Sequence, residues 1–127
     1  MAAISAPFPT LPASDLERAR EFYESVLHFP LSDDQLEGGL LFDVGGGQLW
    51  VYQAPTAGTA QNTAAAWFVD DLAREVAELE RQGVRFETFD APDATWDGVI
   101  LDEGELRSAW FRDSENNILC IDERVTG

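Results

Sequence analysis

The pattern of apolar and polar positions along the chain predicts two amphipathic helices. In the first, apolar residues recur at helical spacing and form one stripe: Leu16, Ala19, Phe22, Tyr23, Val26 and Leu27. Ser14 followed by Glu17 matches a capping box, so we expect this helix to begin at Ser14. It should end near His28, at a position where the left-handed backbone conformation favours glycine.

The second helix repeats this organisation over residues 70–83. Asp70 takes the capping position, Leu72, Val76 and Leu79 repeat the apolar stripe, and Gly83 supplies the C-terminal residue that tolerates a positive φ. Alternating or short apolar runs between turn residues predict strands around both helices. These strands cover residues 4–11, 29–35, 40–44 and 48–53, then 64–69, 84–89, 97–101, 107–112 and 118–122.

The order strand, helix, strand, strand, strand therefore occurs twice, with one additional strand in the second copy, which indicates an internal duplication. We expect one α+β domain over residues 1–127, with a first βαβββ module at 4–53, a linker at 54–63 and a second module at 64–123. Two such modules would form a curved mixed sheet with the helices on its convex face. The concave side would then be the default site for a ligand.

Composition narrows the range of functions. The chain has 24 acidic residues against 8 basic ones, all of them arginines, and a formal net charge of −16. Such a charge disfavours nucleic acid and anionic membrane surfaces, and the lack of lysine excludes Schiff-base chemistry. Cys120 is the only cysteine, which excludes an internal disulfide. Residues 1–7 resemble neither a signal peptide nor an anchor, so we expect a cytoplasmic protein.

Four segments together resemble the vicinal oxygen chelate superfamily, which includes glyoxalase I, extradiol dioxygenases, fosfomycin resistance proteins and the bleomycin resistance protein. They are Leu11–Leu27, Gly45–Tyr52, Trp67–Leu72 and Ala109–Leu119. The last contains a turn similar to the family's Asp-Pro-x-Gly-Asn, with Ser114 and Asn116 in place of proline and glycine. The resemblance spans nearly the whole chain and implies the fold described above. It leaves the activity open, because this fold hosts lyases, oxygenases and sequestering proteins.

The resemblance also implies where metal ligands would stand, usually histidine and glutamate in the first and last strand of each module. In this chain those positions are Phe8, Ala64, Leu49 and Cys120. Three of the four offer no donor atom, and a one-residue shift of register supplies no ligand set. We therefore expect no metal and no other cofactor. The resemblance is strongest to metal-free members such as the bleomycin resistance protein, which binds its ligand in a groove between subunits.

Strand alternation predicts that the ligand-facing surface is largely apolar, with Trp67 and Val69 packed beneath the helices instead. Aromatic side chains would line the rim or a subunit interface, and a guanidinium would hold an anionic group. The candidate ligand-binding residues are Phe8, Phe42, Leu49, Phe68, Trp96, Arg107, Trp110 and Cys120. The alternative for each of them is an ordinary place in the core or on the surface.

Three functions stay open at this point. The first is a metal-independent homodimeric protein that sequesters a small apolar or cationic molecule. The second is a metal-dependent lyase, isomerase or dioxygenase with atypical ligands, for which Asp122 and Gln48 are the nearest candidates. The third is an inert dimer whose aromatic surfaces bind a partner protein. Metal content and ligand binding distinguish the three.

Overall fold

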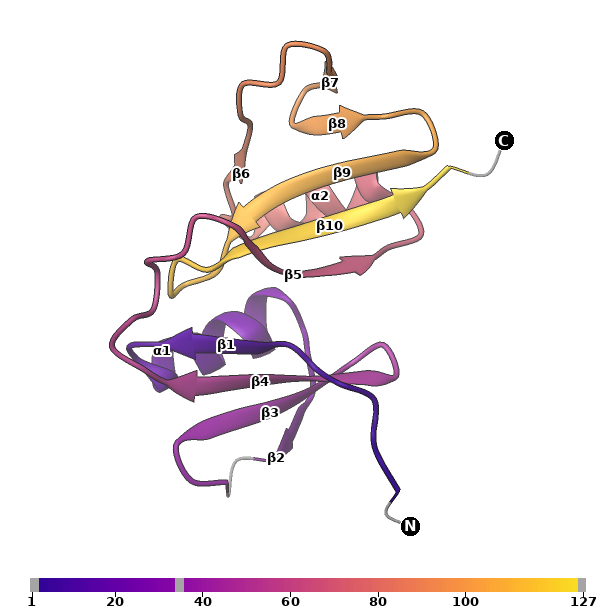
Figure 1. Ribbon diagram of the computed structural model, residues 1–127. Helices are drawn as coiled ribbons and strands as arrows, with labels where there is room; N and C mark the ends of the chain where they lie inside the picture. Colours follow the sequence, from indigo (N-terminus) through magenta and orange to yellow (C-terminus); the bar gives the residue numbers. More distant parts are fainter. Residues whose placement is uncertain (1–2, 34–35, 126–127) are drawn as a thin grey trace. The chain divides into compact units, whose positions relative to one another are not determined.

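A computed structural model describes residues 3–33 and 36–125 of the chain. These residues form two compact units (Figure 1). Unit 1 runs up to Thr59 and also includes Ser114–Asn117, whereas unit 2 comprises Ala60–Asp113 and the residues from Ile118 onward. The boundary near Thr59 falls inside the segment 54–63 that the sequence marks as a connector. Within the described residues, no helix has the length and apolar character needed to cross a membrane.

Unit 1 follows the predicted order strand, helix, strand, strand, strand. The elements are β1 (Thr10–Ala13), α1 (Leu16–Glu21), η1 (Phe22–Val26), β2 (Leu31–Asp33), β3 (Gly39–Val44) and β4 (Gly47–Gln53). The four strands form one sheet in the order β1-β4-β3-β2, with β1 parallel to β4 and the other neighbours antiparallel. Asp34 and Gln35, the last residues of the strand expected at 29–35, lie outside the described residues.

Unit 2 repeats this order and adds a short hairpin. Its elements are β5 (Thr63–Phe68), α2 (Leu72–Arg81), β6 (Phe86–Glu87), β7 (Thr95–Asp97), β8 (Ile100–Asp102), β9 (Leu106–Arg112) and β10 (Ile118–Arg124). The sheet order is β5-β10-β9-β8-β7, and β6 pairs with β9 beyond the end of β8. The strand expected at 97–101 is thus two strands, because a turn with Gly98 at a φ of 63° separates β7 from β8.

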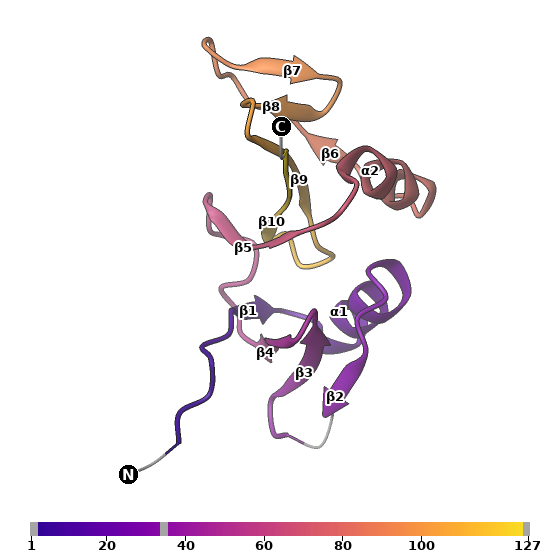
Figure 2. The same ribbon diagram turned by 90° about the vertical axis from the view of Figure 1, so that its right-hand side faces the viewer.

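In each unit the helix covers one face of that unit's own sheet, which Figure 2 shows from the side. In unit 1, Tyr23 of the π-helical segment is fully buried and its ring lies 5.5 Å from that of Phe42 on β3. In unit 2, Leu72, Val76 and Leu79 are the buried residues of α2, which packs on β9 and β10. The mixed α+β class with two βαβββ-type units is therefore confirmed.

The first strand starts later than predicted. Residues 4–9 are not in a strand, and β1 begins at Thr10, although the amide of Trp50 still donates to the carbonyl of Pro9. Pro7 and Pro9 have no amide hydrogen, so the stretch that contains them cannot form a continuous ladder. The prediction of a strand over 4–11 was wrong for this reason.

Both helix caps lie one residue beyond the predicted ones. The N-caps are Asp15 and Asp71, and each carboxylate accepts a hydrogen bond of 3.1 Å from the amide three residues on, Arg18 or Arg74. Ser14 does not cap α1. Its amide and hydroxyl both donate to Oε1 of Glu115, a residue of the turn between β9 and β10.

Glu115 ties this turn to the start of α1 within unit 1. Its side chain is fully buried, and it accepts hydrogen bonds from the amides of Ser14 and Asp15 and from the guanidinium of Arg18 at 2.7 Å. Burial alone would raise the pKa of this carboxyl. The hydrogen bonds from Arg18, the Asp15 amide and Ser114 outweigh that effect and lower the pKa to about 2.

The two helices end differently, as the sequence suggested. Gly83 follows α2 with a φ of 93°, which glycine adopts without strain, whereas His28 follows η1 with a φ of 59°. In the turn after β9, Asn116 takes a φ of 69° at the position where the family pattern has glycine. Asparagine tolerates this conformation better than most residues, so the turn is retained without glycine.

Candidate functional site

Each sheet has a second face that its own helix does not cover, and we call it the open face of that unit. In unit 2 the pairing register identifies its residues, because directly paired residues point to the same side. One row across the strands runs Trp96, Leu101, Ser108, Asp122 and Phe68, and the next contains Glu87, Trp110, Cys120 and Ala66. The intervening residues, among them Phe111, Leu119 and Ile121, are buried on the helix side.

Three aromatic rings come together on the open face of unit 2 and form what we call the aromatic cluster. The ring of Phe89 lies 5.3 Å from that of Trp96 and 4.9 Å from that of Trp110, edge to face in both cases. The two indoles are 6.3 Å apart. Phe89 is 50% exposed, so the cluster is accessible to solvent and has not closed into a core.

Trp110 extends across the sheet. Its Nε1 donates a hydrogen bond of 3.2 Å to the hydroxyl of Thr63 on β5, and β10 lies between β9 and β5 in the sheet. The indole therefore passes over β10, where Cys120 pairs with Trp110 and is only 4% exposed. At the side of Trp110, Glu87 accepts a hydrogen bond of 2.7 Å from Arg112.

A polar trio of Ser108, Cys120 and Asp122 lies beside the aromatic cluster. Oδ1 of Asp122 accepts a hydrogen bond of 2.5 Å from the Ser108 hydroxyl and one of 3.3 Å from the Cys120 thiol. Burial, reinforced by the charge of Asp122, raises the pKa of Cys120 to about 12. The thiol is therefore a hydrogen-bond donor in this arrangement and lacks the thiolate that a nucleophile needs.

The structure brings four of the eight predicted residues to this face: Phe68, Trp96, Trp110 and Cys120. Trp67 lies on the other side, as expected, with its ring 6.1 Å from that of Phe111. Phe89 was not among the candidates. The strand expected at 84–89 is shorter in the structure, where β6 covers only Phe86–Glu87, and Phe89 lies in the irregular segment after it. Ser108 was also missed, and only the register of β9 with β10 identifies its bond to Asp122.

The other four predicted residues lie elsewhere. Phe42 and Leu49 form a directly paired position of β3 and β4, and both are buried on the helix side of unit 1, so the expectation that they line the ligand surface was wrong. The register of β4 differs from the assumed one by one residue. Phe8 is 40% exposed in the extended segment before β1.

Arg107 lies on the helix side of the unit 2 sheet, the same side as Ala109 two residues later on β9. Trp110 lies on the opposite, open face. The guanidinium of Arg107 forms an ion pair with Asp97, with 3.3 Å between Nη2 and Oδ2. This ion pair is the ordinary surface role that the sequence left open for Arg107 as the alternative to ligand binding. The Nε of Arg107 is buried without a hydrogen-bond partner in the described part of the chain.

The open face of unit 1 has a different composition. Register with Thr10 and Pro12 places Trp50 and Tyr52 on it, and Gln48 follows by alternation. Trp50 packs closely over Gly39, where an added Cβ would lie 2.3 Å from the indole. Glycine at position 39 therefore makes room for this ring, which lies flat on its own sheet.

The donor set does not fit a metal ion. Within residues 3–33 and 36–125, no group of three His, Cys, Asp or Glu side chains is placed to hold one. Cys120 and Asp122 are adjacent, but their third partner is the Ser108 hydroxyl, a poor ligand for the divalent metals of this fold. Gln48, the other candidate ligand, is on the sheet of unit 1.

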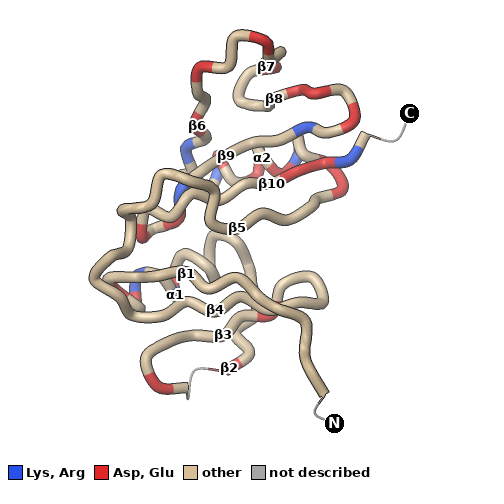
Figure 3. The backbone as a smooth tube through the Cα atoms, in the orientation of Figure 1, with Lys and Arg blue, Asp and Glu red and all other residues tan. Residues whose placement is uncertain are grey.

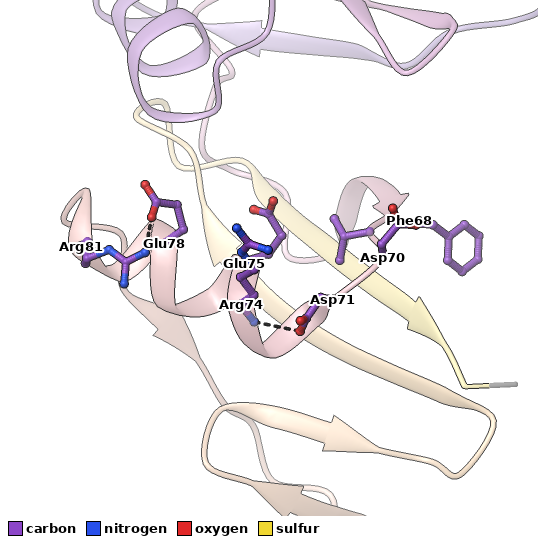
Figure 4. Close-up of a pocket in the computed structure, with 8 residues that line it drawn as sticks. Phe68, Asp70, Asp71, Arg74, Glu75, Glu78 and Arg81 are labelled. Atoms are coloured by element: carbon purple, nitrogen blue, oxygen red, sulfur yellow. Dashed lines mark hydrogen bonds and ion pairs between the residues drawn. The ribbon is translucent and has the colours of Figure 1, made fainter. Parts of the chain in front are cut away.

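Charge is distributed unevenly over unit 2. Figure 3 shows acidic residues at the end of β8 and in the turn from β8 to β9, where Asp102, Glu103 and Glu105 lie. Pro92, Asp93, Leu101 and Glu103 help to line a cavity of about 520 Å³ there. A second cavity, of about 560 Å³, lies along α2 from Phe68 to Arg81 (Figure 4). The interactions drawn there, the Asp71 cap and the Glu78–Arg81 ion pair, stabilise the helix.

Several solved structures share this fold. TnmS3, an antibiotic binding protein from Streptomyces sp. CB03234, is 22% identical with a TM-score of 0.69, over 98% of this chain and 99% of that one. Lactoylglutathione lyase from Agrobacterium tumefaciens is 16% identical with a TM-score of 0.70, over 96% and 95%. The fosfomycin resistance protein FosX from Listeria monocytogenes is 14% identical with a TM-score of 0.64, over 100% and 95%.

At these identities the structures establish the fold and not the activity. No curated protein sequence matches the chain significantly. A family model does match it, over residues 6–121, which is nearly the whole chain. The chain therefore belongs to the Glyoxalase/Bleomycin resistance protein/Dioxygenase superfamily.

Proposed function

We propose that this protein binds a small, flat, apolar or cationic molecule on the open face of unit 2, without a metal ion. The observation that carries the proposal is the aromatic cluster of Phe89, Trp96 and Trp110. A globular domain normally packs three large rings into its core, and here one of them is half exposed on a sheet face. Aromatic rings bind flat molecules with little loss of side-chain entropy.

The residues beneath the cluster favour binding over catalysis. The thiol of Cys120 is protonated at neutral pH, because its pKa is about 12. The nucleophile that the face offers is therefore inactive, and the donor set does not fit a metal. The mechanism would be sequestration, in which stacking and burial of the ligand provide the affinity. TnmS3, which shares the fold, is an antibiotic binding protein, and this is consistent with sequestration.

A homodimer in the cytoplasm is part of the same proposal. The lone cysteine forms no internal disulfide, so a reducing compartment does not threaten the fold. Sedimentation equilibrium of the purified protein tests the oligomeric state. A mass of one chain at all concentrations would contradict the dimer and leave the binding face unaffected.

Titration calorimetry with acridine tests the binding proposal directly, because acridine is flat, neutral at neutral pH and free of metal-chelating groups. We expect saturable binding to protein that has been treated with a chelator. Phe89→Ala should weaken the affinity by about tenfold, since it removes an accessible ring of the cluster. Phe8→Ala is the matched control, because it removes an exposed phenylalanine from unit 1.

Two outcomes would contradict the proposal. One is the absence of binding to the chelator-treated protein, followed by binding once nickel, zinc, iron or manganese is added. That result would restore the metal-dependent lyase, isomerase or dioxygenase as the function. The other is an equal effect of Phe89→Ala and Phe8→Ala, which would remove the aromatic cluster from the site.

A further inference from the structure

Asp122 is a negatively charged group on the open face of unit 2 without a cationic partner. No Arg or His side chain in the described part of the chain forms an ion pair with it. Its neighbour Glu87, on the same face, is neutralised by Arg112. Of these two carboxylates, Glu87 forms an ion pair and Asp122, within the described residues, does not.

The carboxylate is also held in a fixed orientation. Two side chains donate hydrogen bonds to Oδ1 of Asp122. Ser108 donates from the neighbouring strand β9, and Cys120 donates from β10, the strand that carries Asp122 itself. Within the described residues, Oδ2 accepts no side-chain hydrogen bond. Two donors on one oxygen restrict the rotation of the group and leave the other oxygen without a side-chain donor.

Asp122 lies within reach of a ligand bound to the aromatic cluster. Trp110 pairs with Cys120, and Ser108 pairs with Asp122, so Trp110 and Asp122 are diagonal neighbours on adjacent antiparallel strands. Such neighbours are separated by roughly 7 Å. A tricyclic ring on the cluster meets the carboxylate when its long axis runs along β10 toward Asp122 and away from Thr63.

The same edge of the face already accommodates a cation. The guanidinium carbon of Arg124 lies 4.3 Å from the centre of the Phe68 ring, and Phe68 pairs directly with Asp122. Arg124 stacks on the ring and forms no ion pair with the carboxylate. Because Arg124 covers this ring, the group at this edge that is left for a cation of the ligand is the Asp122 carboxylate.

We propose that Asp122 binds a protonated nitrogen of the ligand while the aromatic cluster binds its flat body, so that the ligand class is a planar aromatic amine. This inference rests on the proposed function and specifies its ligand. Oδ2 of Asp122 accepts a hydrogen bond from the nitrogen, and the polar trio keeps the carboxylate in position. A charge-assisted hydrogen bond in a partly desolvated site is stronger than one between neutral groups.

Three probes of nearly the same shape test the inference by calorimetry at neutral pH. They are 9-aminoacridine, which is protonated, acridine, which is neutral, and acridine-9-carboxylate, which is an anion. We expect the wild-type protein to bind 9-aminoacridine about tenfold more tightly than acridine, and the carboxylate most weakly.

Asp122→Asn should remove the preference for 9-aminoacridine and leave acridine binding within about twofold. Binding of acridine by this variant also shows that the face is still folded. Asp43→Asn is the matched control: it removes the same charge from an exposed position on β3 of unit 1, and it should retain the preference. This control separates a local contact from the field of the whole acidic chain.

Equal affinities of the wild-type protein for 9-aminoacridine and acridine would overturn the inference and leave the proposed function intact. An equal loss of preference in both variants would overturn it too, since the field of the chain would then be the cause. If none of the three probes binds, the proposed function fails, and the inference with it. If Asp122→Asn does not fold, the ranking of the three probes by the wild-type protein still decides.

Discussion

The two units of this protein are built alike on their helix-covered faces and differ on their open faces. Both helices are capped by an aspartate with the same 3.1 Å bond, and both sheets bury leucine, a β-branched residue and phenylalanine beneath the helix: Leu49, Val51 and Phe42 in unit 1, and Leu119, Ile121 and Phe111 in unit 2. On the open side, unit 1 has Trp50 lying flat over Gly39, whereas unit 2 has three rings meeting edge to face beside a polar trio. The comparison indicates that the two copies share the packing beneath their helices and differ on their open faces, and it is on the open face of unit 2 that we propose the ligand binds.

The largest difference we expect between the units concerns how each helix start is held. Glu115 is buried and accepts from two backbone amides and Arg18, whereas Glu123 is half-buried and accepts from the amide of Leu72. Glu115→Gln should lower the free energy of unfolding by on the order of 3 kcal/mol, because it removes a buried charge from a set of donors arranged for it. Glu123→Gln should cost about 1 kcal/mol. Urea denaturation followed by circular dichroism measures both, and equal losses would contradict the comparison.

The same carboxyl predicts a pH dependence of stability. The pKa of Glu115 falls from 4.5 to about 2 on folding, so its stabilising contribution is complete above pH 4.5 and is lost as the pH falls toward 2. The difference in unfolding free energy between the wild-type protein and Glu115→Gln should therefore shrink over that interval. A difference that stays constant between pH 5 and pH 2 would show that the charge of Glu115 is not what stabilises α1.

The open faces can be compared by removing one indole from each. Trp110→Ala should weaken acridine binding by about tenfold or more, because stacking on a single aromatic ring contributes about 1–3 kcal/mol. Trp50→Ala should leave the affinity unchanged, since its ring packs on the sheet of unit 1. Titration calorimetry measures both variants, with thermal unfolding as the control for the fold. The opposite order of effects would move the site to unit 1.

A further comparison of the two open faces uses the rate at which a cysteine on each face reacts with a disulfide reagent. Cys120 is buried and its pKa is about 12, so it should react with a disulfide reagent at least a hundredfold more slowly in the folded protein than in urea. A cysteine introduced by Gln48→Cys in a Cys120→Ser background should react faster in the folded state, because position 48 is half-exposed on unit 1. Fast labelling of native Cys120 would show that the polar trio is open to reagents and that the thiol is ionised.

The sequence was sufficient to predict features that come from local periodicity, such as the helices, and insufficient to predict features that depend on the register between paired strands. Helical spacing of Leu72, Val76 and Leu79 identified α2 and its buried face, and Gly83 marked its end, because these signals are local. Register is not local, since a shift of one residue exchanges the two faces of a strand. The assumed register of β4 therefore placed Leu49 on the face away from the helix, and the structure places Gln48 and Trp50 on that face of unit 1 instead.

The candidate site was predictable only in part for the same reason. Phe68 and Cys120 lie on one face, in agreement with alternation within strands, and Trp96 and Trp110, which were expected at a rim or a subunit interface, lie on the same face. Phe89 joins them from an irregular segment, and Glu115 reaches the start of α1 from a turn about a hundred positions later in the chain. Contacts of that kind follow from the tertiary fold and leave no periodic signal in the sequence.

The central claim is that the open face of unit 2 binds a flat ligand without metal, and indole resonances in a nitrogen-15 NMR spectrum test it most directly. The chain has four tryptophans: Trp96 and Trp110 in the aromatic cluster, Trp50 on the open face of unit 1, and Trp67 on the helix side of unit 2. Acridine added in the presence of a chelator should shift the indole signals of Trp96 and Trp110 and leave those of Trp50 and Trp67 in place. A shift confined to Trp50, or shifts that occur only after a divalent metal is added, would contradict the claim.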